Sequence, residues 1–207
     1  MAHLNIENLR RAKLRNEPFE YTIVPGFLSP RILAQVIDTY PAIPKGGSYP
    51  LESLDLPSAL QRVIEEMNGP EFELEIEEKF DVELAGLPKM YSLRGHCRKS
   101  DGKIHTDSKD KVITVLLYLN EKWDHEGGKL RMLRNGANLD DYAEEVSPDD
   151  GTMLIFRRSE KSFHGHGPFE GVRRSIQMNW MVSQNSRAFH RLRHKISARV
   201  KRLVSAQ

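Results

Sequence analysis

The chain of 207 residues contains a single cysteine, Cys97, and no long apolar run. One thiol cannot form an internal disulfide, and a cysteine-based zinc site is excluded as well. A membrane-spanning helix needs about 18 or more consecutive apolar residues, which occur nowhere in the sequence. The first residues, MAHLNIENLRRAKLRNEPF, are too charged to contain the apolar segment of a signal peptide. We therefore expect a cytoplasmic protein.

Internal repeats and low-complexity segments are also absent from the sequence. With 39% hydrophobic and 29% charged residues, the composition is that of a folded chain rather than a disordered one. A chain of this length can bury one sizeable core. We expect a single domain over 1–207, with supporting helices over about 1–88, a β-barrel over about 89–183 and a basic helix over about 186–204.

Positive charge is concentrated near the end of the chain, although the net charge is only +2. From Asn185 to Gln207 there are seven Lys or Arg residues and no acidic residue. Apolar residues recur there at helical spacing, namely Phe189, Leu192, Ile196, Val200 and Leu203. This pattern predicts an amphipathic helix that packs its apolar stripe on the domain. Contact with nucleic acid or with an anionic membrane surface is the alternative.

The earlier part of the sequence favours helices, and the later part favours strands. After a short strand pattern in FEYTIV, Ser29 is a helix-capping residue followed by a proline, and apolar spacing continues the helix to about Tyr40. Two more helices are predicted over about 57–67 and 70–80. Strands are predicted over about 89–96, 103–107, 111–120, 129–134, 151–157, 161–166 and 172–183. The expected fold class is mainly β with flanking helices.

A histidine and an aspartate lie two residues apart in the segment KIHTDSKDKVITVLLYLNEKW. Alternate side chains of a strand share a face, so His105 and Asp107 would point the same way from a strand over 103–107. An imidazole nitrogen and a carboxylate oxygen suit a first-row divalent metal ion, and a second histidine would complete a set that leaves coordination positions open. Alone, His-x-Asp is a weak motif in a chain with eight histidines.

The segment SFHGHGPFEGVRRSIQMNW offers the missing ligand. His164 precedes a Gly/Pro turn and a predicted strand on which Arg173 and Ser175 share a face. A 2-oxo dicarboxylic acid could chelate a metal at one end while an arginine pairs with its far carboxylate. His166, two residues after His164, competes for the role of third ligand.

Taken in order, five blocks of the sequence resemble those of the 2-oxoglutarate- and iron(II)-dependent dioxygenases, in the branch that contains prolyl 4-hydroxylases. The blocks are HTD, ITVLLYLNEKW, GGKLRML, GTMLIF and HGHGPFEGVRRS, and the region of resemblance extends from about Tyr91 to Trp180. The resemblance implies a double-stranded β-helix, which is a jelly-roll or cupin-like barrel, with helices before it. It also implies Fe(II), 2-oxoglutarate and dioxygen, with ascorbate as a further candidate cofactor.

The resemblance further implies that His105, Asp107 and His164 hold Fe(II). We prefer His164 to His166 because the proline and the arginine that follow then stand four and nine residues later, as they do in that branch.

The resemblance also assigns residues to the cosubstrate. Arg173 would pair with the far carboxylate of 2-oxoglutarate, and the hydroxyl group of Tyr118 would bond the same carboxylate. Ser175, Tyr91 and Leu130 are further candidates for this pocket. Strand alternation agrees for Tyr118, which shares a face with residues 112, 114 and 116.

Three other residues after the predicted metal-binding pair are expected to have a structural role. Gly127 and Gly128 would allow a tight turn into the next barrel strand, and Trp123 would pack beneath that turn. The acidic segment 135–150 joins two predicted strands, as a substrate contact or as a solvated connection.

The implied reaction is hydroxylation of an organic substrate, with oxidative decarboxylation of 2-oxoglutarate to succinate and carbon dioxide. The substrate stays open between a peptidyl or free proline or other amino acid and a small metabolite or carbohydrate precursor, because function depends on the periphery of a site. The alternatives are a non-catalytic metal-binding jelly-roll module and a nucleic-acid-modifying dioxygenase. Against the latter, the sequence has no aromatic-rich loop for base flipping and only two tryptophans.

Overall fold

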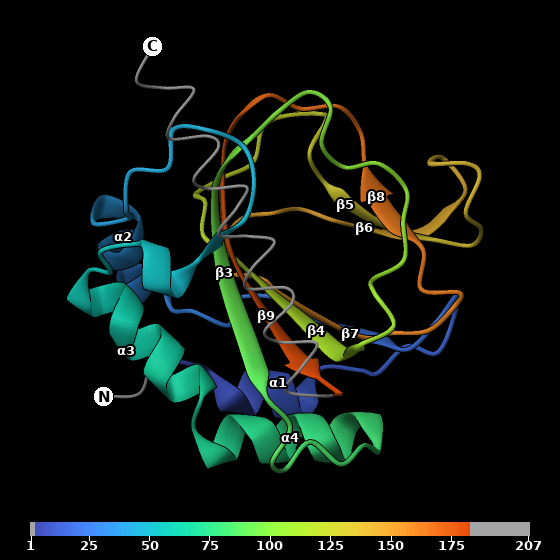
Figure 1. Ribbon diagram of the computed structural model, residues 1–207, viewed down its shortest axis with the longest axis horizontal. Coiled ribbons are helices and arrows are strands. Elements are labelled where there is room, and N and C mark those ends of the chain that lie inside the picture. The colour runs from blue at the N-terminus through green and yellow to red at the C-terminus, as the bar shows by residue number, and fades with distance from the viewer. Residues whose placement is uncertain (1–2, 183–207) are drawn as a thin grey trace.

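A computed structural model of the protein describes residues 3–182 (Figure 1). The helices are α1 (Ile6–Arg11), α2 (Pro30–Asp38), α3 (Ser58–Met67) and α4 (Pro70–Phe80), with a short 3-10 helix, η1 (Leu51–Ser53). The strands are β1 (Tyr21–Val24), β2 (Tyr49–Pro50), β3 (Lys89–Cys97), β4 (Lys111–Tyr118), β5 (Leu130–Leu133), β6 (Tyr142–Val146), β7 (Met153–Arg157), β8 (His164–His166) and β9 (Gly171–Met181). The predicted helix over about 186–204 lies outside the described residues.

The strands form two antiparallel sheets. The larger sheet has the order β1-β7-β4-β9-β3-β2, and the smaller one has the order β6-β5-β8. Figure 1 shows the small sheet across from the large one, with the helices on the other side of the large sheet. Two facing antiparallel sheets of this kind make a double-stranded β-helix, so the predicted fold class is confirmed.

The two faces of the large sheet have different surroundings. Alternate residues of β4 and β9 pack in the core that the sheet shares with the helices: Ile113, Val115, Leu117, Ile176, Met178 and Trp180. The residues between them face the small sheet, and several of them line a cavity. This alternation explains why the central strands carry apolar residues on the face toward the helices and polar residues on the other face.

Local signals account for the helix boundaries. The Ser29 hydroxyl accepts a hydrogen bond from the Ile32 N–H at 3.4 Å, and Pro30 occupies the first turn of α2. A second proline, Pro70, begins α4, which ends where Asp81 adopts a left-handed conformation with φ of 46°. The helices predicted near 30–40, 57–67 and 70–80 are therefore all present. No helix within residues 3–182 is long and apolar enough to cross a membrane.

Two strand predictions were wrong. Residues 103–107 form no strand, because only His105 pairs with another strand residue, in an isolated bridge to His164. Conversely, the acidic segment 135–150 contains β6, which pairs with β5 at the edge of the small sheet. Charged residues are common on edge strands, where they prevent further pairing, and they hid the strand pattern. Within β6, Glu145 forms an ion pair with Arg131 of β5 at 2.6 Å.

The core on the helix side of the large sheet should dominate stability. Val115 is fully buried on β4, whereas Val172 on the neighbouring β9 is 50% exposed. We expect Val115→Ala to lower the free energy of unfolding by about 2 kcal/mol, because it removes two buried methyl groups and leaves a cavity. The same change at Val172 should stay within about 0.5 kcal/mol. Urea denaturation of both variants measures the difference, and equal losses would contradict this account of the core.

Candidate active site

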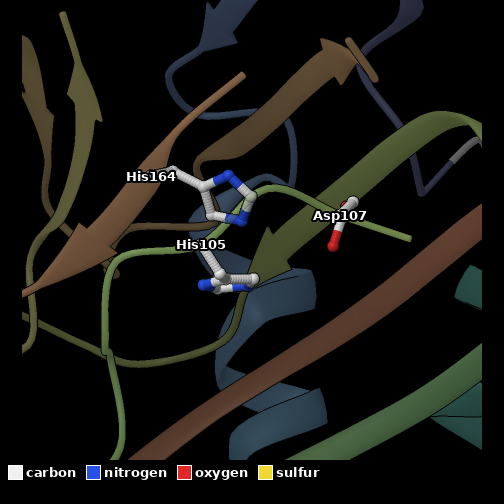
Figure 2. A group of neighbouring side chains, drawn as sticks. All are labelled: His105, Asp107 and His164. Atoms are coloured by element: carbon white, nitrogen blue, oxygen red, sulfur yellow. The ribbon is translucent and has the colours of Figure 1, made fainter. Parts of the chain in front are cut away.

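Three side chains from two distant parts of the sequence meet at one end of the barrel. His105 and Asp107 lie on the segment between β3 and β4, and His164 begins β8 (Figure 2). One donor atom of each residue lies within 4.8 Å of the donor atoms of the other two. Asp107 and His164 are buried, and His105 is exposed. The sequence therefore identified a group that could hold a metal ion, although the strand argument for His105 and Asp107 does not hold.

Backbone pairing brings the two histidines together. The His105 N–H donates to the His164 carbonyl at 3.0 Å, and the His164 N–H donates to the His105 carbonyl at 2.9 Å. The two ring centroids are consequently 4.3 Å apart.

Each histidine ring also has a fixed orientation. Nδ1 of His105 lies 2.8 Å from the Lys103 carbonyl, and Nδ1 of His164 lies 2.9 Å from the Ser162 carbonyl. A carbonyl oxygen only accepts, so Nδ1 must carry the proton, which leaves the Nε2 lone pair free. Burial lowers the pKa of His164 to about 4, so this ring is neutral at pH 7. A neutral imidazole with a free Nε2 is the form that binds metals.

The carboxylate of Asp107 is held in its charged form. Burial opposes ionisation, but the Lys111 ammonium, the His164 ring and the Thr114 hydroxyl together hold the pKa of Asp107 below its usual value. Lys111 Nζ donates to Oδ1 at 2.9 Å, and Thr114 Oγ1 donates to Oδ2 at 2.5 Å. Two imidazole nitrogens and one carboxylate oxygen form the donor set that iron(II) oxygenases use, with positions left for other ligands.

The three residues open into a cavity of about 580 Å³ inside the barrel. The strand register arranges its floor in rows across β3, β9 and β4. From the metal-binding group inward, these rows are Met90–Asn179–Thr114, Ser92–Gln177–Leu116 and Arg94–Ser175–Tyr118. Arg173 lies on the same face of β9, one step beyond the third row. The inner end of the cavity is therefore cationic and rich in hydrogen-bond donors.

Four of the five residues expected to bind the cosubstrate gather around this inner end. Arg173 is buried, and its Nε donates to the Gly128 carbonyl at 2.8 Å. Its guanidinium lies over the Tyr118 ring, 5.3 Å from the centroid. The Tyr118 hydroxyl is buried without a hydrogen-bond partner among the described residues. Ser175 and Leu130 line the cavity beside them.

Tyr91 was wrongly expected in this pocket. It lies on the face of β3 opposite to the cavity-lining residues Ser92 and Arg94, and it packs on the helix side of the sheet. Its hydroxyl donates to Oδ1 of Asn68, beside the end of α3, at 2.9 Å. Arg94 was missed, and its signal in the sequence is its place three residues after Tyr91, on the opposite face of the same strand.

His166, the competing third ligand, faces the cavity but stands apart from the metal-binding group. Its Nδ1 donates to the Gly167 carbonyl at 2.8 Å, and its Nε2 lies 3.9 Å from the buried thiol of Cys97. Gly102 packs directly on the ring, because a Cβ there would come within 2.4 Å of it. His166 therefore helps to close the inner wall.

The double-glycine turn has the structural role expected for it. Trp123 Nε1 donates to the Gly127 carbonyl at 3.0 Å, and Gly128 has a φ of +81°. A Cβ on Gly127 would lie 2.1 Å from the Pro168 carbonyl oxygen. Since the Gly128 carbonyl accepts from Arg173, the turn also orients this arginine.

Comparison with known proteins gives one family model that matches part of the chain. Residues 91–182 match the model of the 2OG-Fe(II) oxygenase superfamily. No curated protein matches the sequence.

Solved structures with a similar fold include a prolyl-4-hydroxylase from Pseudomonas putida, at 18% identity and a TM-score of 0.55, over 85% of this chain and 90% of that one. A prolyl 4-hydroxylase from Phytophthora capsici aligns at 14% identity and a TM-score of 0.60, over 87% and 66% of the two chains. HygX from Streptomyces hygroscopicus, solved with nickel and 2-oxoglutarate bound, aligns at 14% identity and a TM-score of 0.51, over 79% and 83%. At these identities the likeness concerns the fold.

The geometry distinguishes the two neighbouring histidines of β8. We expect His164→Ala to weaken Fe(II) binding by more than about a hundredfold, because even the loss of a residue that supports a ligand costs roughly 10- to 100-fold. His166→Ala should change the affinity by less than about threefold, since its ring lies outside the metal-binding group. Anaerobic titration calorimetry with Fe(II) measures both. The reverse order would make His166 the ligand.

Proposed function

We propose that the chain, whose residues 91–182 match the model of the 2OG-Fe(II) oxygenase superfamily, hydroxylates a carbon atom of an organic substrate while 2-oxoglutarate becomes succinate and carbon dioxide. One atom of dioxygen enters the new hydroxyl group, and the other enters succinate. The observation that carries the proposal is a His-Asp-His group at one end of a cavity whose other end is lined by the buried Arg173, beside Tyr118, whose buried hydroxyl has no hydrogen-bond partner among the described residues.

His105, Asp107 and His164 are the proposed ligands of Fe(II). Their donor atoms come from two imidazoles and one carboxylate, and hydrogen bonds from Lys111 and Thr114 support the carboxylate. Bound Fe(II) would supply the activation of dioxygen that no side chain can perform. The residues of this chain hold the ligand atoms in place, and the neighbouring charges keep Asp107 ionised.

The inner end of the cavity suits the far carboxylate of 2-oxoglutarate. Tyr118 has a buried hydroxyl without a hydrogen-bond partner in the part of the chain that the structure describes, and a buried polar atom of this kind costs free energy until a ligand satisfies it. Arg173 supplies the charge, and Ser175 supplies a second hydroxyl between them. Leu116, Leu130 and Phe156 line the cavity with apolar surface, which limits the access of water to the reacting atoms.

The class of substrate follows less directly. The named prolyl 4-hydroxylases share the fold, which leaves a peptidyl or free amino acid and a small metabolite as candidates. A nucleobase substrate finds little support, because no tryptophan lines the described cavity, and its aromatic neighbours Tyr118 and Phe156 are fully buried.

Two adjacent arginines of β9 provide the test. Arg173 faces the cavity, whereas Arg174 lies on the other face with its guanidinium 5.8 Å from the centroid of the Tyr40 ring. We expect Arg173→Ala to weaken the 2-oxoglutarate dependence of succinate formation by about 10- to over 100-fold, since a hydrogen bond to a charged group contributes roughly 1.5 to 3 kcal/mol. Arg173→Lys should recover part of this loss, because an ammonium keeps the charge without the two-pronged geometry.

Arg174→Ala is the matched control, and it should leave the half-saturating concentration of 2-oxoglutarate within about threefold of wild type. Iron binding should change little in any of the three variants. A larger effect from Arg174→Ala than from Arg173→Ala would refute the proposed cosubstrate site.

A further inference from the structure

A second arginine in the cavity has a buried nitrogen without a hydrogen-bond partner among the described residues. Arg94 lies on β3 opposite Ser175 of β9 and faces the cavity. Its Nε is buried and unsatisfied, and within residues 3–182 its guanidinium makes no hydrogen bond or ion pair. The charge of Asp101 acts to raise the pKa of Arg94. However, the Asp101 carboxylate already accepts hydrogen bonds from Nε, Nη2 and the backbone N–H of Arg98. A buried donor group of this kind indicates a missing acceptor.

Leaving Arg94 unpaired costs free energy, because a second positive charge, Arg173, lies nearby. The two residues are diagonal neighbours on β3 and β9 and point into the same space. Burial, followed by the charge of Arg173, lowers the pKa of Arg94, although a guanidinium remains charged. Two like charges at the inner end of a cavity need anions to balance them.

One cosubstrate does not balance the charges of the cavity. Apart from Lys103 on the exposed rim, Lys111, Arg94, Arg173 and a divalent metal ion would bring five positive charges, and Asp107 together with 2-oxoglutarate would bring three negative charges. Asp101 is cancelled by Arg98. The loaded site would therefore keep an excess of positive charge, of which Arg94 is the part that no protein group satisfies.

The position of Arg94 favours a ligand other than 2-oxoglutarate. The proposed carboxylate site already has donors from Tyr118, Ser175 and Arg173. Arg94 is instead close enough to Asp101 and Arg98, in the segment after β3, for their charges to act on its pKa, and Ser100 and Lys103 of that segment are exposed residues that line the cavity. This is a side of the cavity that molecules can reach from solvent.

We infer that the primary substrate is an acid, which presents a carboxylate or phosphate group to Arg94 while the carbon to be hydroxylated lies toward the His-Asp-His group. This inference rests on the proposed function. It selects, among organic substrates of such an oxygenase, those with an anionic group, and it makes Arg94 a substrate-binding residue distinct from the cosubstrate-binding Arg173.

Two titrations of the full-length, Ni(II)-loaded protein distinguish the role of Arg94 from that of Arg173 without enzymatic turnover. The first adds 2-oxoglutarate to wild type, Arg94→Gln and Arg173→Gln. We expect Arg94→Gln to bind it within about threefold of wild type, and Arg173→Gln to bind it at least about tenfold more weakly. Melting temperatures close to that of wild type show that both variants are folded.

The second titration adds inorganic phosphate, and separately acetate, to protein saturated with 2-oxoglutarate at constant ionic strength. Wild type should bind at least one of these anions, and Arg94→Gln should lose at least about tenfold in affinity. Arg94→Lys should retain part of the binding, because the charge remains. Lys103→Gln, which removes a charge from the exposed rim of the same cavity, should stay within about threefold. The preferred anion tells whether the group is a phosphate or a carboxylate.

Three results would overturn the inference alone: a loss of 2-oxoglutarate binding in Arg94→Gln as large as in Arg173→Gln, no binding of either anion by wild type, or equal losses of anion binding in Arg94→Gln and Lys103→Gln. The first would make Arg94 part of the cosubstrate site. Failure of wild type to bind 2-oxoglutarate would overturn the proposed function, and the inference with it.

Discussion

The site depends on one short antiparallel contact, the pair of backbone hydrogen bonds between His105 and His164. These bonds attach the irregular segment between β3 and β4 to the small sheet, and they place two imidazoles with ring centroids 4.3 Å apart. Asp107, two residues further on, is then brought beside β4, where Lys111 and Thr114 hold its carboxylate. A metal site built in this way is fixed by main-chain geometry on one side and by charge on the other.

The cavity behind this contact follows from strand alternation on the large sheet. Because the helices cover one face with apolar residues, every second side chain of β3, β9 and β4 must point toward the small sheet. Polar and cationic residues occupy those positions at the inner end, where Tyr118 Oη and Arg94 Nε have no hydrogen-bond partner within residues 3–182. A stable interior would not retain such groups without a ligand, so the fold maintains a binding site at some expense of stability.

The helices and the central strands could be predicted because their signals are local. Ser29 with Pro30, and the apolar spacing that follows, are enough to define α2. The strand over 103–107 could not be excluded, since the contact that shapes this segment comes from β8, 59 residues later in the case of His164. The strand β6 was missed because its acidic residues resemble a loop, although Glu145 is paired across the sheet with Arg131.

The distinction between local signals and contacts from distant segments applies to the site as well. The histidines and the aspartate could be named from their spacing and from the resemblance, and Arg173 from its distance along the chain. Tyr91 was misplaced and Arg94 was missed because the face of β3 that points into the cavity is set by its register with β9, which a single sequence does not give.

The central claim is that His105, Asp107 and His164 hold Fe(II) with coordination positions left for 2-oxoglutarate. The most direct measurement is the visible spectrum of anaerobic protein with one equivalent of Fe(II), to which 2-oxoglutarate is added. The account predicts a weak charge-transfer band that saturates with one 2-oxoglutarate per protein, and that is absent from His105→Ala and Asp107→Ala. A band of full strength in either variant, or no band in the wild type, would contradict it.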